Sequence, residues 1–321
     1  MDQAVATLRD ARSVAVVAHR DPDGDTIGSA IALGLALEGL GRRVTLHCAD
    51  PVPGSLAFLP ESGRFAQQPP RVADTVVTVD LASLERARLE LPRATLVNID
   101  HHASNTLFGN VNFVDPSSAA TGEMAARLID ALGARWTPAM ATAILVAIMT
   151  DTGSFQFPNT DPRAHELAAR MLAAGADLPA ITYNVYRVRR FEAMRLWGAA
   201  LARIERELDG VLVWSEVVGS DLERSGARQE DVSGLVEQLA RSTGSRVALL
   251  FNATIPGEVR VSCRTSPFDP SVDASALMGL FGGGGHPRAA GAIVRGGLEA
   301  VRERVLREAR SAIEAARAVR A

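Results

Sequence analysis

The sequence of 321 residues contains no lysine, so all 34 of its basic residues are arginines. We attribute this absence to a compositional bias rather than to selection for phosphate recognition. The formal net charge is only −3. A value so close to zero argues against a protein that holds long nucleic acids on a broad positive surface. It remains compatible with a small substrate that carries a few phosphates.

Cysteine is almost absent as well, with only Cys48 and Cys263. Two distant cysteines exclude a disulfide framework and a zinc site built from thiolates, and they fit a reducing compartment. The most apolar run, MATAILVAIMT, is far shorter than the roughly 20 residues that cross a bilayer. The first residues also lack the basic and apolar segments of a signal peptide. We therefore expect a cytoplasmic protein with no membrane partner.

Short apolar runs rich in β-branched residues are present and predict buried parallel strands. These runs are SVAVVAH, RVTLHC, TVVTVD and ATLVNID. Helical patterns alternate with them at 26–39, 120–133, 138–150 and 161–174. This alternation predicts an α/β fold with an N-terminal, doubly wound parallel sheet. In such sheets, ligands bind beyond the carboxyl ends of the strands.

The pattern changes in the second half of the chain. An arginine-rich helical stretch covers about 178–207, and we interpret its arginines as a solvated helix face. GVLVWSEV then predicts a strand, VALLFNATIPGEVRVSCR a β-hairpin around Pro256-Gly257, and the residues after about 297 a last helix. We therefore expect a catalytic domain at 1–185, a helical linker at 186–207 and a smaller α+β domain at 208–321.

Acidic and histidine side chains follow several of the predicted strands. His19, Asp80 and Asp100 each stand at the end of an apolar run. Further candidates lie beside them in the sequence or after a buried helix: Asp23, Asp25, His101, His102 and Asp151. Aspartates gathered at one sheet edge raise one another's pKa, and bound divalent cations remove that penalty. The sequence therefore predicts a metal centre at this edge.

The mixture of carboxylate and imidazole donors favours Mn²⁺, with Mg²⁺ second. The candidates outnumber the ligands that one ion uses, so we expect two ions, which together can activate water and stabilise a phosphoryl group. Other acids and histidines have simpler interpretations. We expect Asp21 and Asp115 to be turn or capping residues, and His47 and His165 to be isolated packed or surface histidines.

Four segments carry a family resemblance. HRDPDGDTIGS, VTVD, IDHH and MTDTGSF resemble, in the usual order, the four motifs of the DHH phosphoesterase superfamily. That superfamily includes RecJ exonucleases, family II inorganic pyrophosphatases and small oligoribonucleases. GGGGHPRAAGA at 282–292 resembles the glycine-rich histidine motif of the DHHA1 domain. Chain length and two-domain layout are most similar to the NrnA-type oligoribonucleases (nanoRNases), which also dephosphorylate 3′-phosphoadenosine 5′-phosphate (pAp).

The resemblance implies a role for each motif residue. His19, Asp23 and Asp80 would bind one Mn²⁺, and Asp25, Asp80, His101 and Asp151 would bind the other, with Asp80 bridging. Mg²⁺ or Co²⁺ could substitute. The catalytic group would be Asp80, His102 and Asp100, where His102 faces the substrate and Asp100 orients a histidine through its ring N–H.

The second domain would hold the substrate. Four consecutive glycines can form a flexible linker, but glycines also let backbone N–H groups approach an anion closely. The resemblance favours the second interpretation. Arg264, in VSCRTS, would make a guanidinium fork to a phosphate. The expected substrate-binding set is His102, Arg264, Gly283, Gly284, Gly285, His286 and Arg288.

The expected function is that of a Mn²⁺-dependent phosphodiesterase. It would degrade RNA of about two to five nucleotides to nucleoside 5′-monophosphates and remove the 3′-phosphate of pAp. One alternative is a phosphodiesterase of dinucleotides such as c-di-AMP or pApA, which would use the same site. Another is a catalytically inactive nucleotide-binding regulator, against which the complete ligand set argues. A homodimer is compatible with the sequence.

Overall fold

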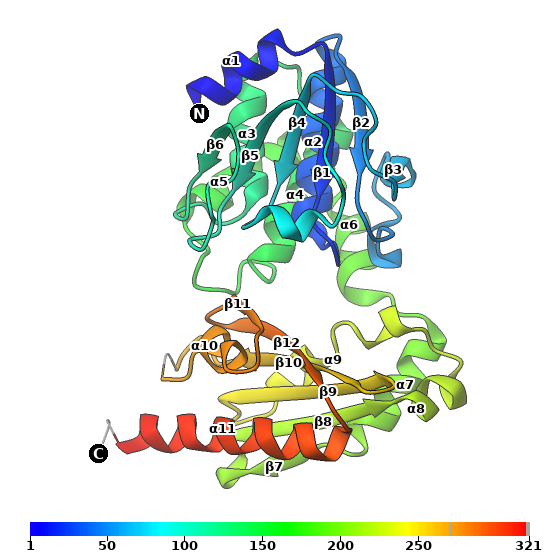
Figure 1. Ribbon diagram of the computed structural model, residues 1–321, viewed down its shortest axis with the longest axis vertical. Helices are drawn as coiled ribbons and strands as arrows, with labels where there is room; N and C mark the ends of the chain where they lie inside the picture. The colour runs from blue at the N-terminus through cyan, green and yellow to red at the C-terminus, as the bar shows by residue number, and fades with distance from the viewer. Residues whose placement is uncertain (270, 319–321) are drawn as a thin grey trace. The chain divides into compact units, whose positions relative to one another are not determined.

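The structure is a computed structural model that describes residues 1–269 and 271–318. Its chain forms two compact units, Met1–Val188 and Arg189–Ala321, each with its own sheet (Figure 1). Among the described residues, no helix is both long enough and apolar enough to cross a membrane.

The first unit is built on a six-stranded sheet in which every neighbouring pair is parallel. The strand order is β3-β2-β1-β4-β5-β6. The strands are β1 (Ser13–Ala18), β2 (Arg43–His47), β3 (Phe65–Ala66), β4 (Thr75–Val79), β5 (Thr95–Asp100) and β6 (Val111–Val114). The helices are α1 (Asp2–Asp10), α2 (Gly24–Gly39), α3 (Thr121–Leu132), α4 (Pro138–Asp151), α5 (Pro162–Ala173) and α6 (Leu178–Ile181). The predicted α/β fold with a parallel sheet is confirmed.

The strand order contains a reversal of direction between β1 and β4. From β1 the chain moves outward to β2 and β3, then returns to β4 and proceeds the other way to β5 and β6. Val14 and Val16 face a large core shared with helices α1 to α5. Ala15 and Val17 face a smaller core under the segment that joins β4 to β5. The loops after β1 and β4 therefore leave the sheet toward opposite faces. Such sheets bind ligands in the space between loops that diverge in this way.

Helices α2 and α4 approach each other closely because glycine stands at their contact. A Cβ atom added to Gly28 would lie 2.3 Å from the carbonyl oxygen of Ala143, a backbone atom that cannot rotate away. A Cβ on Gly24 would meet the side chain of Thr150, one residue before Asp151. These glycines set the distance between the helices that carry Asp25 and Asp151.

We expect Gly28→Ala to lower the stability of the first unit by about 1–3 kcal/mol, the range for overpacked cores. Its melting temperature, followed by circular dichroism, should fall. The matched control is Gly39→Ala in the same helix, where the added Cβ meets no atom within 4 Å. That variant should be as stable as the parent or more so, because alanine is the better helix former. Equal melting temperatures for both variants would contradict the interpretation.

The second unit contains a mixed sheet of order β11-β12-β10-β9-β8-β7. Its strands are β7 (Glu205–Glu207), β8 (Leu212–Val218), β9 (Val247–Ile255), β10 (Glu258–Thr265), β11 (Gly284–His286) and β12 (Ala289–Arg295). Its helices are α7 (Phe191–Leu201), α8 (Gly219–Ser225), α9 (Leu235–Ala240), α10 (Ala274–Gly279) and α11 (Leu298–Ala318). The predicted hairpin is confirmed as β9 and β10, which pair antiparallel around Pro256-Gly257. The predicted last helix is α11 as far as the described residues extend.

The stretch at 178–207 is not the continuous helix that we predicted. A short helix and a π-helical turn (Thr182–Arg187) end at an extended Val188, α7 follows, and 205–207 form edge strand β7. Leu196 and Ala200 of α7 are fully buried in the core of the second unit. Helix propensity alone could not reveal this core, because strand β8, which supplies Val213, comes later in the chain. The proposed domain limits themselves stay a prediction.

Candidate metal centre

The polar residues that follow the strands lie where the strand order reverses. His19 directly follows β1, Asp80 directly follows β4, and Asp100 is the last residue of β5. β1 pairs with β4, and β4 with β5, so these three ends are adjacent. Each of these three residues is at most 3% exposed. Parallel pairing therefore delivers three ligand-type groups to one buried edge.

One group of possible metal ligands combines His19, Asp23 and Asp80, whose ligand atoms lie within 4.8 Å of one another. His19 Nε2 is 3.6 Å from Asp23 Oδ1 and 3.3 Å from Asp80 Oδ2. The other ring nitrogen, Nδ1, lies 2.7 Å from the carbonyl oxygen of Arg20. A proton on Nδ1 would be held by that carbonyl, which leaves the lone pair of Nε2 for a cation.

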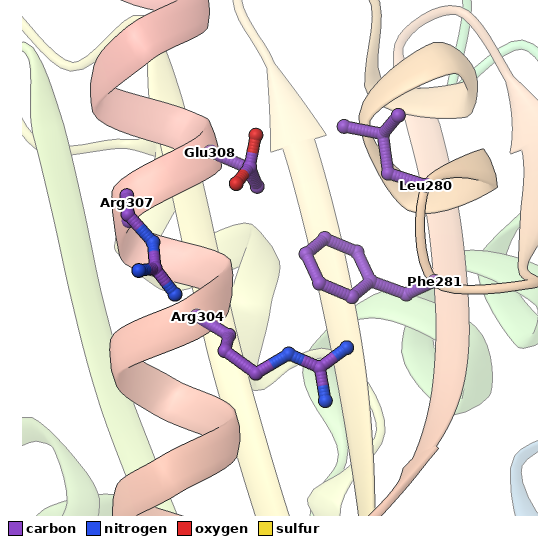
Figure 2. A pocket seen from close by; sticks show the side chains of 5 residues that line it. All are labelled: Leu280, Phe281, Arg304, Arg307 and Glu308. Carbon is purple, nitrogen blue, oxygen red and sulfur yellow. The ribbon is translucent and has the colours of Figure 1, made fainter.

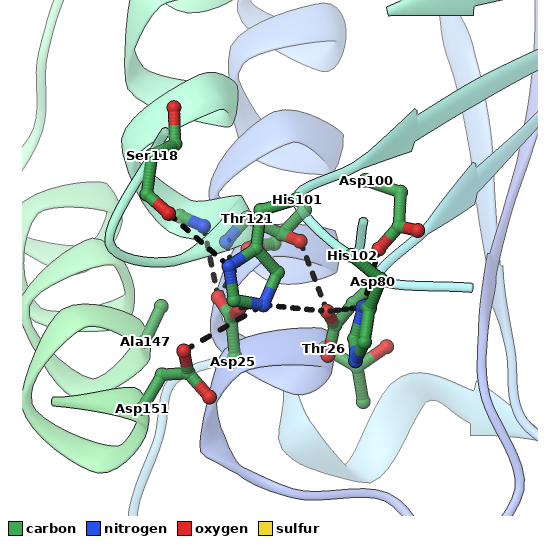
Figure 3. Close-up of polar contacts among 12 residues, drawn as sticks. Asp25, Thr26, Asp80, Asp100, His101, His102, Ser118, Thr121, Ala147 and Asp151 are labelled. Atoms are coloured by element: carbon green, nitrogen blue, oxygen red, sulfur yellow. Dashed lines mark hydrogen bonds and ion pairs between the residues drawn. The ribbon is translucent and has the colours of Figure 1, made fainter. Parts of the chain in front are cut away.

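The second group combines Asp25, His101 and Asp151. His101 Nε2 is 3.9 Å from Asp25 Oδ2 and 3.6 Å from Asp151 Oδ2. Its Nδ1 lies 3.2 Å from the carbonyl oxygen of Ser118, so Nε2 again faces the carboxylates. Figure 3 shows both aspartates pointing toward this imidazole. The two groups thus repeat one design, a backbone-oriented histidine facing acids.

Asp80 connects the two groups. Its Oδ2 faces His19, whereas its Oδ1 is 3.7 Å from His101 Nε2 and accepts a 3.0 Å hydrogen bond from Thr121 Oγ1. The residue has a left-handed φ of +66°, which turns the chain sharply at the end of β4. The amide of Asp80 still donates to the carbonyl oxygen of Ile99, so the backbone remains tied to β5. One carboxylate is therefore held between two imidazoles.

The electrostatics of this cluster favour a cation. Burial and the charges of neighbouring carboxylates, with Asp80 the largest, hold the pKa values of Asp25 and Asp151 well above the usual range. Burial opposes a charge on His19, but Asp23 and Asp80 raise its pKa to about 10. The buried carboxylates repel one another, and the raised pKa of His19 shows that a positive charge is favoured beside them. Both effects indicate that a bound cation would stabilise this cluster. Oxygen and nitrogen donors without thiolates fit Mn²⁺ or Mg²⁺.

Asp25 is held by the start of α3, a contact that the sequence analysis did not predict. The amides of Thr121 and Gly122, at the beginning of α3, donate to its two carboxylate oxygens at 2.7 and 2.8 Å. Ser29 Oγ donates to the same carboxylate at 3.2 Å. A Cβ on Gly122 would lie 2.5 Å from that of Ala147. The predicted helix at 120–133 was the only sequence signal for this contact.

His102 belongs to a separate hydrogen-bonded chain. Its Nδ1 is 2.7 Å from Asp100 Oδ1, and Asn105 Nδ2 donates to Asp100 Oδ2 at 2.6 Å. Burial lowers the pKa of His102, but the bond to Asp100 and the charge of Asp80 together raise it. With Nδ1 engaged by Asp100, any role of this ring toward a substrate would fall to Nε2. Asn105, which sequence reasoning missed, fixes the carboxylate that orients this histidine.

The predicted substrate residues of the second unit occupy defined positions. Gly284, Gly285 and His286 form strand β11, and a Cβ on Gly283 or Gly285 would lie 2.2 or 2.5 Å from a carbonyl oxygen of the facing β12. Gly283 and Gly285 therefore permit a close strand pair, and 284–286 form a strand rather than a flexible linker. Arg264 donates from Nε and Nη2 to Glu237 Oε1 at 3.0 and 2.7 Å.

The guanidinium of Arg288 is hydrogen-bonded within the second unit. Its Nη1 lies within 3.3 Å of Thr265 Oγ1 and of the carbonyl oxygens of Ser266, Asp269 and Val272. It thereby holds the segment that follows β10. Phosphate binding by Arg264, by Arg288 and by the glycine-rich strand stays a prediction.

The two acids expected in turns and the two histidines expected to be isolated have these roles in the structure. Asp21 has a left-handed φ of +51° in a turn, and Asp115 accepts from Ser117 and Arg127. His47 is buried and forms hydrogen bonds with the carbonyl oxygen of Gln68 and the hydroxyl of Thr45. The ring of His165 stacks on Phe155. A separate hollow of about 270 Å³ lies in the second unit, and Figure 2 shows the side chains around it. It is lined by Leu280, Phe281, Arg304, Arg307 and Glu308 and contains no histidine.

Comparison with known proteins identifies both domains of the chain. The DHH family, N-terminal domain, matches residues 13–148, and the DHHA1 domain matches residues 212–316. The bifunctional oligoribonuclease and PAP phosphatase NrnA of Thermus thermophilus is 37% identical over 92% of this chain and 88% of its own. The protein of the same name from Bacillus subtilis is 26% identical over 87% of this chain and 89% of its own.

A solved structure has the same fold over nearly the full length. An exopolyphosphatase-related protein from Bacteroides fragilis superposes with a TM-score of 0.85 at 21% identity, covering 98% of this chain and 95% of that one. At this identity the similarity concerns the fold alone. The sequence matches decide the family: the chain belongs to the DHH–DHHA1 phosphoesterases and is similar over most of its length to their NrnA-type members.

Proposed function

We propose that the protein is a Mn²⁺-dependent phosphodiesterase that degrades very short RNA to nucleoside 5′-monophosphates and also removes the 3′-phosphate of pAp. The observation that carries this proposal is the position of Asp80 between two histidine–carboxylate groups. A bridging carboxylate flanked by two such groups suits a pair of cations acting on one phosphorus centre. The names of the Thermus thermophilus and Bacillus subtilis relatives supply the two substrate classes.

The residues have distinct tasks in this proposal. His19, Asp23 and Asp80 hold one cation, and Asp25, Asp80, His101 and Asp151 hold the other. When bound, the two ions supply Lewis-acid stabilisation of phosphoryl oxygens and a water of lowered pKa. His102, oriented by Asp100, presents Nε2 to the phosphate and can donate a proton to the leaving oxygen. His286, Arg264 and the backbone of 283–285 bind phosphate in the second unit.

A side-by-side rate panel tests the proposal. The substrates are pApA, an RNA of about five nucleotides, a single strand of about 20 nucleotides, pAp, c-di-AMP and pyrophosphate, each with Mn²⁺, Mg²⁺ or Co²⁺. We expect Mn²⁺ to give the highest rates, and the two shortest RNAs and pAp to be turned over fastest. Equal rates on the long strand would reject the preference for short RNA. No turnover of any ester with any of the ions would favour a nucleotide-binding regulator instead.

A further inference from the structure

An aromatic side chain of the second unit is almost completely exposed. Phe268, in the segment between β10 and α10, is 94% exposed, so both faces of its ring are open. Other rings of this unit are covered: the guanidinium of Arg302 lies 5.3 Å from the ring centre of Trp214, and that of Arg304 lies 5.7 Å from the ring centre of Phe281. Single exposed apolar side chains are common on protein surfaces. The way in which the chain holds this one therefore decides its meaning.

The backbone around Phe268 is fixed by one guanidinium. Arg288 Nη1 lies 3.3 Å from the carbonyl oxygen of Ser266 and 3.0 Å from that of Asp269. It also lies 3.2 Å from the carbonyl oxygen of Val272. The amide of Phe268 donates to Ser266 Oγ at 3.3 Å. The open ring is thus presented from a fixed backbone, which reduces the entropy that a ligand must lose when it binds there.

The same segment is bound at both ends to the turn that follows His286. The carbonyl oxygen of Pro287, in this turn, accepts from Thr265 Oγ1 at 3.1 Å and from the amide of Ala274 at 2.8 Å. His286 ends β11, and Arg264 directly precedes Thr265 at the end of β10. Both belong to the expected phosphate-binding set. The open ring therefore lies on a segment that is anchored to the two strand ends where we expect a phosphate.

A nucleotide offers a phosphate and an aromatic base, joined by one sugar. Bases stack on phenylalanine rings, and every base has a face that can do so. We propose that Phe268 is a specificity-determining residue that stacks on a base of the substrate while Arg264 and His286 bind its phosphate. This inference rests on the proposed activity on short RNA and pAp and deepens it. It gives the second unit a means of preferring nucleotides over other phosphate esters without selecting one base.

Phe268→Ala, Phe268→Trp and the control Ile293→Ala test this assignment. Ile293, on β12 of the same sheet, is a 49% exposed apolar residue. Binding of AMP and of ribose 5-phosphate, which has no base, is measured by calorimetry with Mn²⁺ present. We expect Phe268→Ala to weaken AMP binding by about 10-fold and to leave ribose 5-phosphate binding unchanged. Its kcat/KM for pApA should fall to a similar extent, mainly through KM.

The other two variants define the contact further. Phe268→Trp should bind AMP at least as tightly as the parent, because indole also stacks on bases. Its fluorescence should decrease on addition of AMP by more than that of the parent, since the new indole would lie against the base. Ile293→Ala should match the parent with both ligands.

Three results would overturn the assignment. The first is parental AMP binding in Phe268→Ala. The second is an equal loss of ribose 5-phosphate binding in that variant, which would indicate a general effect on the phosphate site. The third is a parent protein that binds AMP no more tightly than ribose 5-phosphate. If the parent binds AMP but hydrolyses no ester, the proposed function fails, and the comparison of the two ligands still decides the role of Phe268.

Discussion

Replacing Asp80 by asparagine is expected to reduce kcat/KM for short RNA and pAp by about 1000-fold or more, the largest effect of any single change that we consider. Asp80 Oδ2 faces His19 and Oδ1 faces His101, so the carboxylate serves both possible cation positions. Asparagine keeps the shape but loses the charge and one of the two acceptor oxygens. It also tolerates the left-handed φ of +66° better than alanine would. The loss of activity should therefore not arise from misfolding.

The measurement pairs steady-state rates with Mn²⁺ titration calorimetry. The parent should bind two Mn²⁺ per chain, and Asp80→Asn should bind fewer or bind them more weakly. The matched control is Asp21→Asn, an acid in the same loop as His19 whose left-handed φ asparagine also tolerates. It should keep the parental rate and Mn²⁺ stoichiometry. Parental turnover in Asp80→Asn would refute the bridging role, and an inactive Asp21→Asn would show that the whole acidic loop contributes.

The position of this centre was predictable because it depends on strand ends. The apolar runs before His19, Asp80 and Asp100 are short and β-branched, so they predicted strands, and parallel strands place their carboxyl ends together. No knowledge of the strand order was needed to bring these three residues to one edge. The reversal between β1 and β4, which creates the space for them, became visible only in the fold.

The supports of the centre were not predictable from local pattern. Thr121 and Gly122 bind the carboxylate of Asp25 from positions 96 and 97 residues later in the chain. Any helix start offers free amides, so the sequence does not say which anion they meet. Gly122 looked like an ordinary helix residue, although its missing side chain is what lets α3 reach α4. Such contacts depend on tertiary packing, which periodicity does not encode.

In the second unit, glycine composition was ambiguous for a physical reason. The same four glycines fit a mobile linker, an anion-binding loop or a strand pressed against its neighbour. The structure shows the last of these for Gly285 of β11, because a Cβ there would collide with Ala289 and Ala290 of β12. A strand with close backbone contact can still present N–H groups to a phosphate. The structural and functional interpretations of this motif are therefore compatible.

Asp100→Asn is expected to lower kcat by about 100-fold or more with little change in KM or in Mn²⁺ stoichiometry. Asp100 is fully buried and accepts from both His102 Nδ1 and Asn105 Nδ2. An asparagine at this position has one acceptor oxygen for two donors. If the oxygen keeps its bond to Asn105, the new amide group faces His102 and favours the ring tautomer with its proton on Nε2. The imidazole would then lose the carboxylate that stabilises its protonated form, which the leaving oxygen requires.

Asn105→Ala separates the support of Asp100 from its bond to His102, and its melting temperature reports the loss of the other hydrogen bonds of Asn105, to Leu81, Asn98 and Leu107. The substitution removes the donor to Asp100 Oδ2 but leaves the bond between Asp100 and His102, so kcat should fall by only about 10-fold. The two kcat values, together with the Mn²⁺ stoichiometry, distinguish two roles for Asp100. A fall in the number of bound ions in Asp100→Asn would make it a metal ligand, since its oxygens also lie within 4.8 Å of ligand atoms of Asp80 and His102. An unchanged number with a large loss of kcat places its action on the orientation and charge of His102, and hence on the protonation of the leaving group.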